Sequence, residues 1–475
     1  MKFSVLGHAC LYIEHEGVRL ITDPWLFGSC YWRSWWNYPE PDLEVIANLH
    51  PTHVYLTHLH WDHYHGPSLR KFYKDDPVIL LPKCPTQRML KDILSDFRFS
   101  RVQELAHGKK YKLSDTFEIA SYQFNPAFID SSLVVVADGV KLLNANDSKV
   151  FGFSLAQIIK RYKSFDFVFR SHSSASPIPY CIDGVDPSLS SRAPSDYSRE
   201  FVAFAEACKA KYAIPFASSH VYLREDSMQY NAFYNNPVNI LTAHRQCKTH
   251  SQCVLMPATS SWSTEDGFQL ADHNYEHIDL HVNEMRARHH QALESIEVKQ
   301  RVQLLDRKAF IAYFQGFTSA LPFFLRKMRI GFFLGNSMDH DVMGVLAIVD
   351  TRRPSKVQVF DDISFSNQLV VDYSVDFLIR TYPAIVNDCT RKHMFNTFTP
   401  SKLLRIYEGT SRGSCSRFLT LLDLYENDGL PLTQNLQWRQ LSIWISRWRE
   451  AFDVLIYVYL IKVRRLPIYR LWANV

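Results

Sequence analysis

Four side chains of the metal-ligating types fall within six residues of this sequence. His58, His60, Asp62 and His63 stand in the segment THLHWDHYH, directly after the apolar run HVYLT. Alternate side chains of an extended segment point the same way, so His58 and His60 can hold one ion together. A turn into a helix then brings Asp62 and His63 to a second ion. The spacing predicts a binuclear metal site, with Asp62 also a candidate catalytic group; a histidine-rich surface loop or a helix N-cap is the alternative.

Three further candidates each follow an expected strand. Asp23 stands in RLITDPW, Asp147 in LLNAND and His220 in FASSHVY. Taken alone, an aspartate after a strand is more often a turn or cap residue, and a lone histidine there is usually structural. Their place in series with the histidine cluster, Asp23 before it and Asp147 and His220 after it, is what makes them candidates for the same site.

The segment THLHWDH resembles the HxHxDH signature of the metallo-β-lactamase superfamily, and the resemblance continues in order through the first half of the chain. It implies an αββα sandwich with two bound metal ions. It also implies that Asp23 orients the metal-binding loop without binding metal, that Asp147 is the bridging carboxylate, and that His220 is the last histidine ligand.

The sequence departs from the superfamily pattern at one ligand. Most members carry a histidine between the signature and the bridging aspartate, but no histidine occurs here between His107 and His172. The nearest candidate is Asp130 in AFIDSSL, which is equally compatible with a strand cap or Asx-turn. If Asp130 binds, the first ion has two imidazoles and a carboxylate, a set that favours iron or manganese over zinc.

A closer resemblance points the same way. The strings GHACLYIEHEGVRLITDPWLFG, YWRSWWNYPEP and FIDSSLVVVADGVKLLNAND are similar to the metal-binding domain of the CMP-N-acetylneuraminate hydroxylase family. RSHSSASPIPY, which contains His172, resembles the proline-containing turn of that family. The resemblance implies non-haem iron and dioxygen. The paired Cys-x-His and Cys-x-x-His elements of that family's Rieske domain are absent from these residues, so we expect an external electron donor.

The aromatic loop between Trp25 and Pro41 joins the expected strand that ends at Asp23 to the segment leading to the histidine cluster. Core packing or an interface is the default for so many aromatic residues. Because of its position, part of the loop can also wall the metal site. The side chains that we expect to contact a small-molecule substrate, including an anionic group, are Arg33, Trp36, His172 and Tyr222.

The expected elements divide the chain into two domains. Residues 1–265 alternate short β-like runs with helical stretches, which suits a layered αββα arrangement in the α/β class. Residues 266–475 read first as helices, then as a strand-rich α+β region, and finally as a strongly amphipathic or buried helix. We therefore expect a metallo-β-lactamase-type sandwich followed by a C-terminal α+β domain, which can complete the pocket or drive homodimerisation.

Composition excludes several classes. The 475 residues are 47% hydrophobic and 21% charged, with a formal charge of only +5, which is an ordinary globular balance without the footprint of a nucleic-acid-binding protein. We see no signal peptide and no transmembrane segment, and nine cysteines without repeated CxxC pairs indicate a reducing cytoplasm. Near the end, Lys462, Arg464, Arg465 and Arg470 interleave with apolar residues; a solvated helix face is favoured over a peripheral membrane contact.

Three functions compete at this stage. The first is a binuclear non-haem iron oxygenase, a hydroxylase or N-oxygenase of a small polar molecule. The second is a hydrolase of an ester, amide or phosphodiester, in which two zinc or manganese ions activate a water molecule. The third is a non-catalytic binding module that retains the fold.

Overall fold

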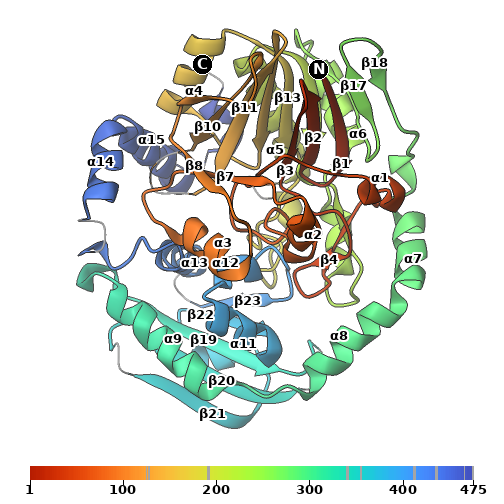
Figure 1. Cartoon of the computed structure of the whole chain (residues 1–475). Coiled ribbons are helices and arrows are strands. Elements are labelled where there is room, and N and C mark those ends of the chain that lie inside the picture. The colour runs from red at the N-terminus through yellow and green to blue at the C-terminus, as the bar shows by residue number, and fades with distance from the viewer. Residues whose placement is uncertain are drawn as a thin grey trace.

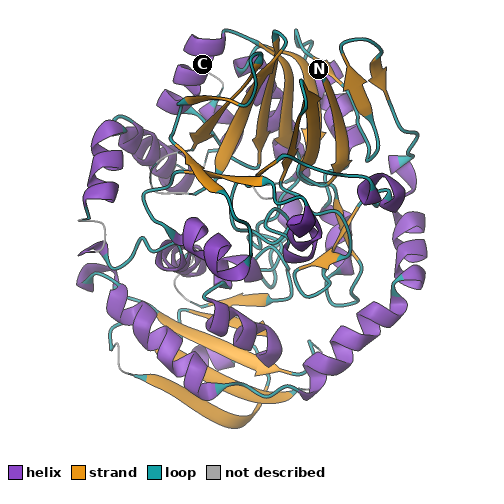
Figure 2. Cartoon of the chain, viewed as in Figure 1, coloured by secondary structure: helices purple, strands orange, loops and turns teal. Residues whose placement is uncertain are grey.

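A computed structural model describes residues 1–124, 126, 129–189, 193–338, 342–353, 356–409, 413–433, 437–464 and 466–472. Two large sheets lie face to face in its upper part (Figures 1 and 2). The first sheet runs β18 (Gly267–Gln269), β17 (Ser261–Ser263), β1 (Lys2–Gly7), β2 (Cys10–His15), β3 (Val18–Thr22), β6 (His53–Tyr55), β7 (Val78–Pro82) and β8 (Val102–Leu105). The second sheet runs β16 (Gln252–Cys253), β14 (Ala210–Phe216), β13 (Phe165–Ser171), β12 (Val140–Asn146), β11 (Ser131–Ala137), β10 (Phe117–Gln123) and β9 (Lys110–Lys112).

The space between these sheets is a dry apolar core. Side chains from both inner faces, among them Phe3, Leu11, Phe117, Phe169 and Ile214, form one buried cluster. Alternation along each strand sends every second side chain into this layer. The dipeptide Asp138-Gly139 is typical of a tight hairpin turn, and it joins β11 to β12 with both residues at positive φ, as a two-residue turn requires.

Helices cover the outer face of each sheet. A buried cluster packs the first three helices against the first sheet, and another packs the next three against the second sheet. These helices are α1 (Leu43–Ala47), α2 (Gly66–Lys71), α3 (Arg88–Asp96), α4 (Gly152–Tyr162), α5 (Pro194–Ala207) and α6 (Pro237–Gln246). The four layers are those of the expected αββα sandwich, and the fold class is confirmed.

The second half of the chain forms another sheet below the sandwich (Figure 1). Its strands, in spatial order, are β21 (Val357–Ser364), β20 (Met343–Asp350), β19 (Arg329–Gly335), β22 (Phe377–Thr381) and β23 (Arg405–Glu408). The helices of this half are α7 (Ile278–Arg288), α8 (His290–Val302), α9 (Arg307–Ala320), α10 (Leu369–Asp372), α11 (Pro383–Lys392), α12 (Phe395–Phe398) and α13 (Ser414–Glu426). In Figure 1, α7 and α8 descend along one side of the molecule from the sandwich to this sheet.

The two halves share one core. Trp25, Tyr31 and Trp35 of the aromatic loop belong to the same buried cluster as Phe314 and Phe332 of the second half. Within that loop, β4 (Ser29–Cys30) and β5 (Trp35–Asn37) pair into a small sheet with β15 (His220–Tyr222). The default expectation for the loop, packing in a core, therefore describes these residues.

The last residues return to the sandwich. After α14 (Trp438–Ser446) and α15 (Glu450–Tyr457), a short π-helical segment (Val458–Val463) and a 3-10 turn (Ile468–Leu471) follow. Leu471 and Trp472 pack in the cluster formed by α4, α5 and the second sheet. The division of the chain near residue 265 stays a prediction; that position lies in the turn of the hairpin β17–β18, whose strand β17 pairs with β1.

Candidate metal centre

Asp23 holds the histidine loop in place. Its side chain is fully buried, and its two carboxylate oxygens accept hydrogen bonds from the Thr57 backbone N–H and the Thr57 hydroxyl, each at 2.8 Å. The same carboxylate lies 3.1 Å from Nδ1 of His63 and accepts a hydrogen bond from the Asn146 amide. Asp23 thus fixes the orientation of one histidine ring and of the loop's first residue, which is the arrangement that the superfamily resemblance implies.

Two groups of ligand atoms overlap at His63. One consists of His58, His63 and Asp147, and the other of His8, Asp62 and His63; within each group the ligand atoms lie within 4.8 Å of one another. The Nε2 atom of His63 is 3.1 Å from Asp62 Oδ2 and 3.4 Å from Asp147 Oδ1. The structure therefore brings together four of the residues that we expected at the site, from two separate segments, with His8 added from a third.

Several polar atoms at the site are buried without a hydrogen bond of good geometry. Among the described residues these are His8 Nδ1, His8 Nε2, His63 Nε2, Asp147 Oδ1 and His220 Nδ1, although His8 Nε2 and His63 Nε2 lie 3.0 and 3.1 Å from Asp62 Oδ2. Buried polar atoms are otherwise satisfied almost everywhere in proteins, so several orphaned atoms in one place call for a ligand. Imidazole nitrogens and carboxylate oxygens at these separations fit divalent metal ions.

Asp147 reaches this group because of a local irregularity in the second sheet. The pairing of β12 with β13 shifts register between Asn144 and Asn146, and Asn146 has a positive φ of 55°. The Asn146 side chain accepts a hydrogen bond from the Asp147 backbone N–H at 3.0 Å. A bulge of this kind re-aims the following side chain, here toward His63.

His58, His60 and Asp130 line a second part of the site. They share a cavity of about 250 Å³, and the Nε2 atom of His58 lies 2.8 Å from Nδ1 of His60. Burial and a neighbouring imidazole lower the pKa of each of these histidines to about 4, so both rings are neutral near pH 7, the form that binds metal. Burial raises the pKa of Asp130.

Sequence reasoning did not single out two residues of this region. His8 directly follows β1 and is 1% exposed, with Nε2 at 3.0 Å from Asp62 Oδ2. The sequence feature that could have identified His8 is its position at the end of an apolar strand, between Gly7 and Ala9. Asp423 of α13 lines the same cavity as Asp130, and burial together with the charge of Asp130 raises its pKa to about 7. No local pattern links this residue of the second half to the histidine loop.

His220 lies beside the ligand groups rather than within them. Its ring stacks on Trp35 with centroids 3.4 Å apart, and the His8 ring is 5.5 Å away. His8, and not His220, is therefore the histidine grouped with Asp62 and His63.

The aromatic loop is strained where it meets the site. Tyr31, Trp32 and Arg33 all have positive φ, at 52°, 55° and 63°, a conformation that bulky residues rarely adopt. The Tyr31 hydroxyl donates to Asp62. The second half holds the loop through three hydrogen bonds, to the Asp388 carboxylate, the Pro400 carbonyl and the Ser401 carbonyl. The second half thus supports the conformation that places Tyr31 against a candidate ligand.

The four expected substrate contacts do not gather in one place. Trp36 stacks on His289, 4.0 Å away, in a cluster with α7 and α8. His172 is fully buried with Nδ1 3.3 Å from the Phe216 carbonyl oxygen, and burial lowers its pKa to about 3. Tyr222 is buried beside His220, with ring centroids 5.4 Å apart, and Arg33 is half-buried.

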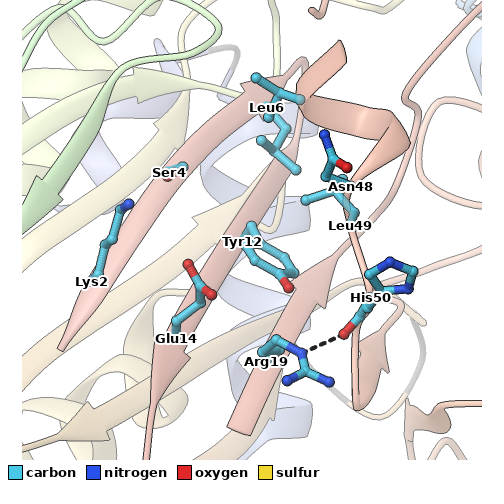
Figure 3. A pocket seen from close by; sticks show the side chains of 10 residues that line it. Lys2, Ser4, Leu6, Tyr12, Glu14, Arg19, Asn48, Leu49 and His50 are labelled. Carbon is cyan, nitrogen blue, oxygen red and sulfur yellow. Dashed lines mark hydrogen bonds between the residues drawn. The ribbon is translucent and has the colours of Figure 1, made fainter. Parts of the chain in front are cut away.

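Another hollow of the described residues lies apart from the candidate metal centre and lacks its ligand residues. A hollow of about 560 Å³ lies on strands β1 to β3, where Lys2, Glu14, Arg19 and His50 project and the Arg19 guanidinium bonds the His50 carbonyl (Figure 3). It contains neither of the two ligand groups found among the described residues. All nine cysteines are unpaired.

The comparisons agree with the geometry. Residues 2–133 match the family model described as a β-lactamase superfamily domain. A Mycobacterium tuberculosis protein named provisionally as a Rieske 2Fe-2S iron–sulfur protein is 26% identical over 259 residues, which cover 50% of this chain and 48% of that protein. Cytidine monophosphate-N-acetylneuraminic acid hydroxylase of Pan troglodytes is 33% identical over 152 residues, covering 31% and 26%. This chain therefore spans about half, or less, of the length of these relatives.

Among solved structures, the diiron β-hydroxylase CmlA of Streptomyces venezuelae aligns over 54% of this chain and 52% of that one, with 18% identity and a TM-score of 0.38. Residues 2–133 thus match a β-lactamase superfamily domain, and the four-layer sandwich of the first half has the metallo-β-lactamase-type fold. A bilayer-spanning helix is absent from the described residues.

Proposed function

We propose that the protein is a non-haem iron oxygenase, a hydroxylase or N-oxygenase of a small polar molecule. The observation that carries the proposal is the cavity shared by His58, His60 and Asp130. Two imidazoles and one carboxylate around open space form the ligand set associated with oxygen-activating iron, whereas zinc sites of the superfamily use a histidine in place of Asp130. The similarity of residues in the first half to a hydroxylase supports the same class.

The ligands divide between two ions. We assign His58, His60 and Asp130 to the first ion and Asp62 and His63 to the second, with Asp147 between them. His220 completes the second set by the superfamily resemblance, and His8 lies on the same side of Asp62. Two iron ions held in this way would supply the redox chemistry with dioxygen.

The chain's own residues prepare the site for that chemistry. Phe395, Leu419 and Leu422 of the second half form the apolar wall of the cavity opposite the histidines, which limits the access of water. Asp423, with its raised pKa of about 7, can hold a proton at its carboxylate near neutral pH. The Tyr31 hydroxyl, through its hydrogen bond, fixes one oxygen of Asp62.

The net reaction requires an external reductant. Insertion of one oxygen atom into a C–H or N–H bond consumes one dioxygen, two electrons and two protons, and releases one water molecule. We propose that a redox centre outside these 475 residues delivers the electrons.

Metal analysis of anaerobically purified protein tests the proposal. We expect about two irons per chain, a near-ultraviolet charge-transfer band that appears on exposure to oxygen, and loss of iron in Asp130→Asn. Asp166→Asn is the matched control, because Asp166 bonds only the Lys141 backbone N–H at 2.9 Å, far along the sheet from the site. Protein that is fully active with zinc, without oxygen or reductant, would overturn the assignment and favour the hydrolase.

A further inference from the structure

The helices α14 and α15 expose apolar side chains and bury polar ones. Eight large hydrophobic residues between 438 and 459 are exposed, and several are more than half exposed, including Trp438 at 78%, Ile445 at 65% and Leu455 at 63%. Such a concentration within a single short segment exceeds the scattered apolar residues of an ordinary surface. The exposed set is Trp438, Ile445, Trp448, Phe452, Leu455, Ile456, Val458 and Tyr459.

The inner side of these helices is polar. Gln440, Arg447, Glu450 and Asp453 are 5%, 6%, 1% and 1% exposed. Arg447 donates to Glu450 at 2.9 Å and to the Gln123 side chain at 2.6 Å, and Asp453 accepts from the Phe153 backbone N–H at 2.8 Å. Polar contacts therefore hold the inner side of the segment against the sandwich. Its apolar side chains remain exposed although the helices are docked.

The exposed positions of α15 lie on one side of that helix. Phe452, Leu455 and Ile456 are three and four residues apart, and the ring of Trp448, just before the helix, contacts that of Phe452 edge to face at 5.9 Å. In Figure 1, α14 and α15 stand at the outer edge of the molecule, beside the sandwich. Neither helix could cross a bilayer, since they contain 9 and 8 residues.

Cations outnumber acids in this segment. Residues 438–475 contain seven arginines and lysines and two acids, Glu450 and Asp453, which are both buried; two of the cations are paired, Arg439 with Glu104 and Arg447 with Glu450. Of the cations, Arg449 lies over the Trp448 ring at 5.6 Å, and Arg464 and Arg470 are exposed; Arg465 lies outside the described residues. Trp, Tyr and Arg around an apolar helix face are the composition of segments that lie in a membrane interface.

We propose that this face, the exposed side chains of residues 438–459 with the flanking Arg449, Arg464 and Arg470, binds the surface of a membrane that contains anionic lipids. The apolar side chains would enter the boundary between headgroups and acyl chains, and the guanidinium groups would contact lipid phosphates. Pairing of two copies through the same face is disfavoured, because a two-fold axis would bring these cations against each other.

Vesicle co-sedimentation of the full chain tests the proposal. The probes are phosphatidylcholine vesicles alone and with roughly one-third phosphatidylglycerol. We expect binding to the anionic vesicles that weakens at high salt, and at least tenfold weaker binding to the neutral ones. Removing charges in Arg449→Gln/Arg464→Gln should weaken anionic-vesicle binding about fivefold for each arginine, since each contributes about 1 kcal/mol near such a surface.

The apolar contribution is tested with Trp448→Gln/Leu455→Gln, for which we expect at least tenfold weaker vesicle binding. Both side chains are exposed, so the fold is spared, which a melting curve checks. Leu304→Gln/Phe323→Gln is the matched control, because these residues are 81% and 82% exposed but lie in the other half of the chain. Wild-type protein that binds neither vesicle would overturn the proposal. So would a dimer in light scattering that Trp448→Gln/Leu455→Gln dissociates while vesicle binding is absent, since the face would then be a contact between protein chains.

Discussion

Replacement of Asp23 by asparagine should weaken metal binding although Asp23 is not a ligand. The Asp23 carboxylate contacts four groups: the Thr57 backbone N–H, the Thr57 hydroxyl, the Asn146 amide and His63 Nδ1. An asparagine has one acceptor oxygen in place of two and turns an NH₂ group toward donors. Asp23→Asn therefore keeps the bond from the Thr57 N–H and loses the charge-assisted contact to His63.

The magnitude follows from that lost contact. An outer carboxylate that orients a ligating histidine typically contributes 10- to 100-fold in metal affinity, or about 1.4–2.7 kcal/mol. One hydrogen bond to a charged group also contributes about 1.5–3 kcal/mol to folding, so the free energy of unfolding of the metal-free variant should be lower by that amount.

Two measurements distinguish the loss of metal affinity from the loss of folding stability. Competition with a chromophoric chelator gives the metal affinity, and urea unfolding of the metal-free protein gives the stability. Asp166→Asn removes a carboxylate of the same fold that bonds a single backbone N–H, and should leave metal affinity unchanged. An Asp23→Asn protein with wild-type affinity, or an equal loss in Asp166→Asn, would refute the orienting role.

Three further outcomes are expected. Chelation of the metal should lower the melting temperature, because the buried ligand atoms of His63 and Asp147 are left without partners; an unchanged melting temperature would speak against a metal centre. Gly152→Ala should destabilise the fold by about 1–3 kcal/mol, since Gly152 has a φ of 57° and its added Cβ would clash with the Asp453 carboxylate; equal melting curves would contradict this. Burial lowers the pKa of Lys402 from 10.5 to about 8, so the folded state binds fewer protons than the unfolded state between these values, and stability should rise with pH there. Lys402→Met should remove that rise and, in urea titrations near pH 7, gain up to about 3 kcal/mol; a parallel pH dependence in both proteins would rule this out.

Local residue patterns in the sequence were sufficient to predict the sandwich fold and the residues at the centre of the candidate site. The spacing of His58, His60, Asp62 and His63 has few structural solutions, because an extended run followed by a turn places those side chains together wherever it occurs. The same holds for the hairpin at Asp138 and Gly139, which depends on neighbouring residues alone. Asp23 and Asp147 were found because each ends a strand of the same sandwich.

Only the tertiary structure decided what surrounds that centre. His8 joins Asp62 because β1 ends beside the histidine loop, and Asp423 reaches the cavity because α13 packs under it, 293 residues after Asp130 along the chain. The aromatic loop was expected by default to pack in a core, and only the structure shows that this core is shared with the apolar surface of the second half. Contacts of this kind depend on how whole faces match, and no local pattern of residue types encodes them. The inward turn of Glu450 and Asp453, with apolar residues outside, is likewise visible only once α15 is docked on the sandwich.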